Sequence, residues 1–206
     1  CALANAIYMK ADWVNKFEKE GTYKETFTDI NGDESEIDFM HQVTNVQYYE
    51  NGDTKAVKLP YENGLSMVVV LGDTKNILND IHNNKMTSKL VDVSLPKFKA
   101  EYSIDYVNIL KNMGIEKAFD NQNADFSLML ENYPERIKID SVLQKAMIDV
   151  DEKGTEAAAA TVAVLTKSAL SVDEEVIEFR ADKPFTYYIL DDSGNVYFAG
   201  RYVKAE

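Results

Sequence analysis

The chain has 206 residues, of which 45% are hydrophobic, so it is long enough to bury a sizeable core in one or two domains. Its 35 acidic and 22 basic residues give a formal net charge of −13, which argues against nucleic-acid and anionic-lipid partners because both require basic patches. The longest apolar runs, such as Met67–Leu71, are too short to span a bilayer, and the single cysteine, Cys1, excludes an internal disulfide.

Strand signals dominate the chain from end to end. Segments rich in β-branched and aromatic residues, or with apolar and polar residues in alternation, are typical of strands. We predict strands at Ala2–Lys10, Ser35–Glu50, Lys55–Pro60, Ser66–Leu71, Lys89–Leu95, Ile137–Val150, Glu175–Arg180, Phe185–Leu190 and Val196–Val203.

Turn sequences separate several of these strands. They are rich in glycine, asparagine and aspartate, which tolerate positive φ. They lie at Asn31–Asp33, Asn51–Asp53, Glu62–Gly64 and Asp192–Asn195. We predict hairpins at Asn51–Gly52 and Ser193–Gly194.

Two segments have helical periodicity. Lys75–Asn83 places its apolar residues on one face, with Asp73–Thr74 available as a cap. Tyr102–Met113 does the same, with Ser103 or Asp105 as a cap and Gly114 as the stop. The sequence contains no domain boundary, so we predict one structural unit.

Catalytic and metal-binding patterns are not found in the sequence. His41 and His82 have no nearby ligand pattern, and Cys1 is alone, whereas zinc sites need closely spaced Cys or His residues. Ser141 and Ser168 lack the glycines of a nucleophile elbow and an evident base. We therefore expect a protein that is not an enzyme and that uses neither a metal nor a cofactor.

Residues 150–170 carry the most information about function. A strand-like stretch ends at Glu152, Gly154 frees the backbone, and residues 155–161 are all small except Glu156. Without a further proline or glycine, the segment is suited both to a solvated loop and to a strand with a full hydrogen-bond ladder. It is equally a good helix sequence on composition alone, so composition leaves these alternatives open.

Four stretches of sequence, in their order and spacing along the chain, favour the loop-and-strand interpretation over the helix. Residues 142–161 read VLQKAMIDVDEKGTEAAAAT, and residues 5–13 read NAIYMKADW, followed by Phe17 and Phe27. Residues 95–98 read LPKF, with LKNMGI at 110–115, and the chain closes with FRADKPF at 179–185 and FAGR at 198–201. Together they resemble the serpins, a family of serine-protease inhibitors, over essentially all 206 residues.

The resemblance implies an α+β, β-rich serpin fold with a large central sheet, smaller sheets, few helices in this portion and an exposed reactive loop at about residues 153–174. It implies that residues 1–206 are the C-terminal portion of a single serpin domain. We expect the missing N-terminal part to be a partner of this portion. Secretion to the extracellular space is favoured, and a cytoplasmic location stays open.

The mechanism that the resemblance implies is a suicide-substrate inhibition. A serine protease cleaves the exposed loop, and the cleaved loop enters the central sheet of a metastable fold as a new strand, with the protease trapped as an acyl-enzyme. The rival interpretation is a non-inhibitory serpin that acts as a carrier, chaperone or binding protein.

The hinge sequence meets the physical requirement of insertion. Side chains alternate along a strand, and a charge in the buried set costs several kcal/mol. The set that starts at Thr155 contains no charge, and Glu156 falls on the opposite set. We therefore expect arginine at Thr155 to block insertion while leaving folding intact. The predicted hinge comprises Glu152, Lys153, Gly154, Thr155, Glu156, Ala157, Ala158, Ala159, Ala160 and Thr161.

The resemblance also implies a gate that controls opening of the sheet. Trp13, Lys97 and Glu152 are expected to meet where the loop enters, with a Lys97–Glu152 ion pair. Lower in the sheet, where the family commonly places a histidine facing an asparagine, this chain has Asn5 facing Gln144. An amide can hydrogen-bond another amide, so we expect the contact without its pH sensitivity.

The reactive bond follows from family spacing counted from Gly154. That spacing places the bond between Ser168 and Ala169, which suits an elastase-like or subtilisin-like protease with a small specificity pocket. A loop shorter by one residue exposes Lys167–Ser168 instead, which suits a trypsin-like protease.

Overall fold

The computed structural model describes residues 1–129, 137–155 and 175–205. It is strand-rich, and its two α-helices are short: α1 (Ile77–His82) and α2 (Val107–Asn112). Three 3-10 turns lie at η1 (Lys19–Gly21), η2 (Lys117–Phe119) and η3 (Ser127–Met129). No helix in the described ranges has the length and apolar character that crossing a membrane requires.

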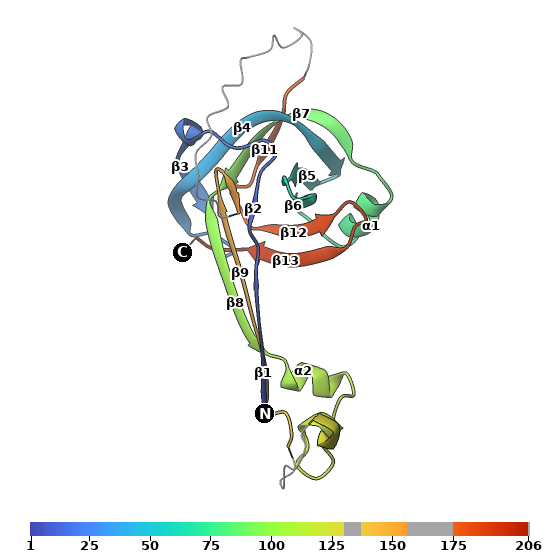
Figure 1. Ribbon diagram of the computed structural model, residues 1–206. Coiled ribbons are helices and arrows are strands. Elements are labelled where there is room, and N and C mark those ends of the chain that lie inside the picture. The colour runs from blue at the N-terminus through green and yellow to red at the C-terminus, as the bar shows by residue number, and fades with distance from the viewer. Residues whose placement is uncertain (130–136, 156–174, 206) are drawn as a thin grey trace. The chain divides into compact units, whose positions relative to one another are not determined.

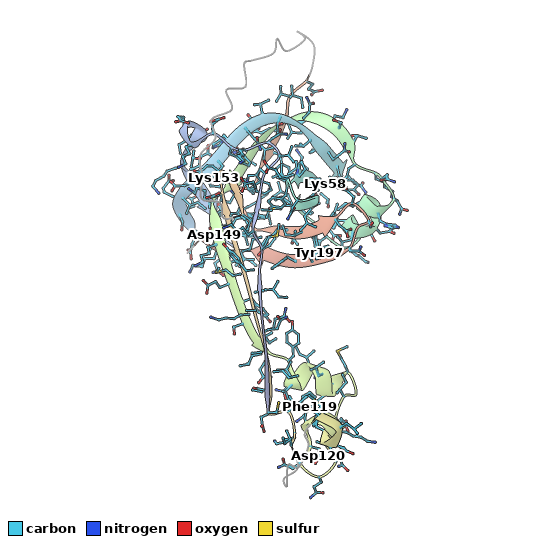
Figure 2. The ribbon with its side chains drawn as sticks, viewed as in Figure 1. Lys58, Phe119, Asp120, Asp149, Lys153 and Tyr197 are labelled. Carbon is cyan, nitrogen blue, oxygen red and sulfur yellow. The ribbon has the colours of Figure 1, made fainter. Side chains whose placement is uncertain are left out.

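The chain forms two compact units. The first contains Cys1–Met9 and Lys99–Ile148, and the second contains Lys10–Phe98 and Asp149–Glu206. In the first unit, β1 (Ala2–Tyr8) pairs in parallel with β9 (Ser141–Asp151), and β8 (Phe98–Asp105) also pairs with β9. Phe119 lies near α2 in this unit, with Lys111 Nζ 5.9 Å from the centre of its ring (Figure 2).

The second unit is built on an eight-stranded sheet. Its strand order is β11-β7-β4-β5-β6-β12-β13, and β3 pairs with β4 outside this path. Figure 1 shows the sheet strongly curved, with β4 and β7 facing β12 and β13. The strands are β3 (Thr22–Thr28), β4 (Glu34–Asn51), β5 (Thr54–Pro60), β6 (Leu65–Leu71), β7 (Thr87–Pro96), β11 (Ile177–Arg180), β12 (Phe185–Asp191) and β13 (Val196–Tyr202).

The core of the second unit lies inside this curved sheet. All six residues from Ser66 to Leu71 are at most 7% exposed, which explains why β6 has five consecutive apolar residues, Met67–Leu71, rather than an alternating pattern. A cluster of aromatic rings closes one end, where Phe98 packs against Phe185, Tyr187 and Tyr202.

Most predicted elements are present with shifted ends. The hairpins at Asn51–Gly52 and Ser193–Gly194 connect β4 to β5 and β12 to β13, and Gly52 and Gly194 have φ of 58° and 84°. The predicted helix over Tyr102–Met113 is wrong in its first third, because residues through Asp105 belong to β8 and pair with β9. Asp105 Oδ1 accepts the Val107 N–H at 3.0 Å, but the N-cap residue is Tyr106, which makes no side-chain cap hydrogen bond, so Asp105 is not the cap residue that was predicted.

Besides β8, three strands were missed by the sequence prediction. β3 has little apolar content, and it forms because it pairs in full with the first part of β4. The two-residue strands β2 (Ala11–Asp12) and β10 (Gly154–Thr155) are too short to have a periodic signal, and both lie where the predicted hinge begins.

Candidate functional site

The turn after β9 folds the chain back into the sheet. Asp151 Oδ1 accepts hydrogen bonds from the backbone N–H groups of Lys153 (2.8 Å) and Gly154 (3.2 Å), which closes the turn. Beyond it, β10 runs antiparallel both to the end of β9 and to β2. The first two residues after the turn therefore already occupy a strand position between β9 and β2.

Gly154 occupies a position that no other residue can fill without a shift of the backbone. Its φ is +149°, which L-residues rarely adopt. A Cβ atom there would overlap the Ala11 carbonyl oxygen and would lie 2.6 Å from the Asp12 Cα and 2.8 Å from the Trp13 nitrogen. The glycine is therefore required by the close approach of β10 to β2.

Thr155 directs its side chain into the core of the second unit. The residue is 0% exposed, and its hydroxyl lies 2.9 Å from the Tyr61 hydroxyl. The Tyr61 ring stacks on the Trp13 indole with centroids 4.2 Å apart. Burial raises the pKa of Tyr61, an effect that the Thr155 hydrogen bond opposes in part. Tyr61 therefore stays a neutral phenol over the physiological pH range.

Trp13 holds the turn through backbone carbonyls. Its indole Nε1 donates to the Asp151 carbonyl at 3.0 Å, and its backbone N–H donates to the Lys153 carbonyl at 2.8 Å. The Phe17 N–H donates to the carbonyl between them, that of Glu152, at 2.9 Å. Three consecutive carbonyls of the turn are thus fixed by donors from one short segment.

An ion pair lies beside this turn. Lys97 Nζ is 3.0 and 3.1 Å from the two carboxylate oxygens of Glu152, whose side chain is 7% exposed while that of Lys97 is 36% exposed. Burial raises the pKa of Glu152, but hydrogen bonds from its own backbone N–H and from Lys97 lower the pKa by a larger amount. The net pKa is therefore below the usual value. The carboxylate is therefore ionised at neutral pH.

A second predicted pair lies in the first unit. Asn5 of β1 and Gln144 of β9 are register partners in the parallel ladder, so their side chains leave the same face. Tyr8 and Met147 close this directly paired stretch. From Ala2 to Tyr8, β1 is thus paired directly with β9.

A comparison with protein families decides what this arrangement belongs to. The family model "Serpin (serine protease inhibitor)" matches residues 1–205. This chain belongs to the serpin family. An uncharacterized serpin-like protein of Thermococcus kodakarensis is 37% identical over 216 residues, covering 97% of this chain and 48% of that protein. The chain thus spans about half the length of the curated serpins that it matches.

Solved serpin structures share the fold. The native-state structure of the thermophilic serpin tengpin matches with a TM-score of 0.82 and 30% identity over 99% of this chain and 55% of its own. Human thyroxine-binding globulin in complex with thyroxine matches with a TM-score of 0.80 and 25% identity over 95% of this chain and 54% of its own.

The structure brings some of the predicted serpin site residues together. Lys97 contacts Glu152 directly, and Trp13 contacts the same turn through the carbonyls on either side of Glu152. Of the hinge, Glu152 to Thr155 are described, whereas Glu156 to Thr161 and the candidate reactive-bond residues Lys167, Ser168 and Ala169 lie outside the described residues. Among the described residues, no group of three or more His, Cys, Asp or Glu side chains could hold a metal ion.

One expectation is corrected, and one residue was missed. Arginine at Thr155 would not leave folding intact, because Thr155 is completely buried in this state and bonded to Tyr61. Tyr61 itself had no sequence signal, since it follows a predicted strand and precedes a turn. It becomes part of the site through an isolated β-bridge to Trp13, a contact between distant segments.

Replacement of Gly154 by alanine tests the close approach of β10 to β2. We expect a loss of about 1–3 kcal/mol or more in unfolding free energy, because the new methyl must push the two strands apart. Gly32→Ala is the matched control, since Gly32 also has a positive φ of 88° but no atom near its added Cβ. Chemical denaturation of both variants measures the difference. Equal losses would contradict the steric explanation.

The Lys97–Glu152 pair predicts a pH dependence of stability. A carboxylate whose native pKa is lowered stabilises the fold fully above its unfolded pKa, about 4.3, and this contribution is lost as the pH falls through the native pKa. Glu152→Gln should therefore lower the melting temperature at pH 7, and the deficit should shrink toward pH 3. The exposed pair Lys99–Glu101 supplies the control, Glu101→Gln, for which we expect little change. A deficit that stays constant down to pH 3 would show that the charge is irrelevant.

Proposed function

We propose that the complete protein inhibits serine proteases by the suicide-substrate mechanism, with a reactive loop at about residues 153–174. The protease cleaves this loop, and the loop then enters the sheet between β2 and β9 while the protease remains attached. The observation that carries the proposal is the buried side chain of Thr155 at the start of β10.

Thr155 sets the phase of any strand that continues β10. Because side chains alternate along a strand, the residues two, four and six positions later enter the same core. These are Ala157, Ala159 and Thr161, which are small and uncharged, while Glu156 falls on the other face. The sequence therefore allows β10 to be extended without burying a charge.

Extension of β10 requires β1 and β9 to separate. Thr155 pairs with both Ala11 and Val150, and we propose that a strand continuing in this register would replace the direct pairing of β1 with β9. The direct pair of Asn5 and Gln144 would open during this exchange, and the Lys97–Glu152 pair lies beside the point of entry. We propose these residues, with Trp13, as the gate.

Arginine substitutions on alternate positions test the insertion. In the full-length protein, Ala159→Arg places a charge on the set that would be buried, and Ala160→Arg is its matched control on the opposite face. We expect the yield of SDS-stable protease complex to fall more than about tenfold for Ala159→Arg, with cleavage of the loop instead, because burying a charge costs several kcal/mol. Ala160→Arg should retain the complex. Equal yields from the two variants would rule out insertion in this phase.

The reactive bond is proposed between Ser168 and Ala169, with Lys167–Ser168 as the alternative. The hydroxyl oxygen of the protease serine would attack the carbonyl carbon of the first residue and form an ester with it. The C–N bond to the second residue would break, and the serine proton would pass to the leaving nitrogen, which becomes a new amino terminus. An elastase-like or subtilisin-like protease is the preferred target, and a trypsin-like one belongs to the alternative.

Mass spectrometry of the peptide released by a panel of these proteases identifies the bond. A peptide beginning at Ala169 supports the first assignment, and one beginning at Ser168 supports the trypsin-like one. Cleavage confined to residues before Thr161 would eliminate both, because too little loop would remain to cross the sheet.

Melting of the cleaved product tests insertion, which should raise the melting temperature through the added strand.

A non-inhibitory binding function is the second candidate. The observation in its favour is the similarity in fold to thyroxine-binding globulin, which is a ligand-bound serpin structure. An unchanged melting temperature after loop cleavage would favour it. For either function, we propose that the N-terminal part of the domain covers the apolar side chains exposed on the first unit, such as Leu3, Leu143 and Met113. Secretion stays a prediction.

A further inference from the structure

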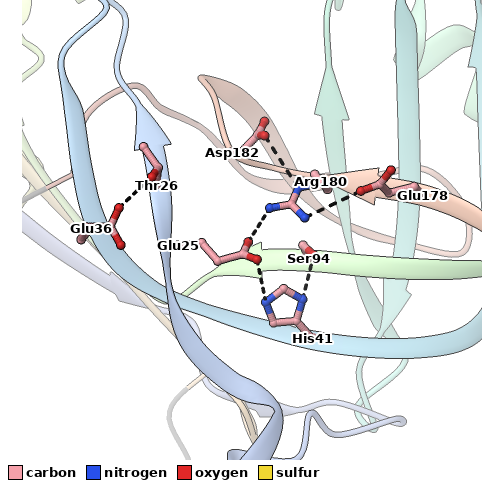
Figure 3. A network of polar contacts seen from close by, with 8 residues as sticks. All are labelled: Glu25, Thr26, Glu36, His41, Ser94, Glu178, Arg180 and Asp182. Carbon is pink, nitrogen blue, oxygen red and sulfur yellow. Dashed lines mark hydrogen bonds and ion pairs between the residues drawn. The ribbon is translucent and has the colours of Figure 1, made fainter.

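Four polar side chains from four different strands meet on one face of the eight-stranded sheet. They are Glu25 of β3, His41 of β4, Ser94 of β7 and Arg180 of β11, and Figure 3 shows them linked in a chain of contacts. Three of them form a row across the sheet, because Arg180 is the register partner of Ser94, and Ser94 is that of His41. Glu25 reaches over this row from the opposite side of β4.

Two of the contacts within this group are short hydrogen bonds, and the third is a longer contact between His41 and Glu25. Arg180 Nη2 donates to Glu25 Oε2 at 2.7 Å, and Ser94 Oγ lies 2.8 Å from His41 Nδ1. His41 Nε2 faces the other carboxylate oxygen, Glu25 Oε1, at 3.8 Å. The Tyr23 ring stacks flat on the imidazole, with centroids 4.2 Å apart and planes 3° from parallel. His41 is thus held on two sides with its free edge toward Glu25.

Burial strengthens the Glu25–Arg180 contact. The Glu25 and His41 side chains are each 15% exposed, so their charges are only partly screened by water, whereas Arg180 is 39% exposed. Glu178 and Asp182 lie 3.7 and 3.8 Å from the guanidinium. Burial lowers the pKa of Arg180, but Glu25, Asp182 and Glu178 raise it, and the net pKa is above the ordinary value.

The strand that Arg180 belongs to needs such a contact. β11 has four residues, lies at the edge of the sheet and pairs in parallel with β7 alone. Its other attachments are the buried Phe179 ring and the Ala181 N–H, which donates to the Ser94 carbonyl at 2.9 Å. Short parallel edge strands have few hydrogen bonds to lose, so one charged contact changes their opening measurably.

We infer that Glu25 and Arg180 form a latch that retains β11 on the sheet, with His41 as the positioning residue that orients Glu25. β11 begins at Ile177, so the latch holds the strand that follows segment 156–174 in the sequence. The latch does not rest on the proposed function.

Hydrogen exchange of the full-length protein tests the latch without reference to inhibition. Glu25→Gln keeps the shape of the side chain and removes its charge, and Arg180→Met keeps the apolar stem. Each should speed amide exchange in the peptide that covers residues 176–182 by about tenfold, while peptides of β12 and β13 stay unchanged. The double variant should be no faster than the single ones, because both remove the same contact.

Thr26→Val is the matched control. Thr26 is the next residue on β3, and its hydroxyl donates to Glu36 at 2.7 Å without contact to β11. It should leave exchange in residues 176–182 as in the wild type. His41→Phe, which keeps the stack on Tyr23, should give an intermediate rate. Equal exchange in Glu25→Gln and Thr26→Val, or additive effects in the double variant, would overturn the latch.

Discussion

The stack of Trp13 on Tyr61 is the contact on which the rest of the site depends. It places one indole against the turn between β9 and β10, where Trp13 and Phe17 supply donors to three consecutive carbonyls. It also positions the Tyr61 hydroxyl for Thr155. A buried hydroxyl pair is stable only when both partners are satisfied, so the start of β10 is held in one place and one phase.

β10 and β11 are held on their sheets by different kinds of force. At β10 the contacts are close and buried: Gly154 packs against the β2 backbone, and Thr155 is fully buried. At β11 the attachment combines one buried phenylalanine with the charged contact of Arg180 and Glu25. The first kind is set by shape and is insensitive to salt, whereas the second is electrostatic and partly exposed to solvent.

β9 pairs with β1 along most of its length and with β10 at its end. Between the end of β9 and β2 the sheet already contains an extra two-residue strand, but β1 and β9 remain bonded to each other through seven register pairs. The ionised Glu152, paired with Lys97, lies in the turn between β9 and β10 and contributes an attraction that depends on pH.

The sequence by itself determined the elements with strong local signals. Glycine-containing turns with positive φ gave correct hairpins at Gly52 and Gly194, because the conformational demand is local and few residues meet it. The family, the α+β class and the pairing candidates Lys97 and Glu152 were also accessible, since motifs in order and spacing are a property of the sequence. The sequence also predicted that the alternate residues starting at Thr155 carry no charge.

Tertiary structure alone decided which distant residues complete each site. β3 and β8 form because they pair with a partner strand. The pattern of apolar residues within their own 7 or 8 residues does not predict this pairing. Tyr61 joins Trp13 and Thr155, and Glu25 joins Arg180 155 positions away, through side-chain contacts across the sheet. The burial of Thr155 likewise depends on β2 and Tyr61 covering it. Contacts of this kind are set by packing in three dimensions, and a single sequence carries no local trace of them.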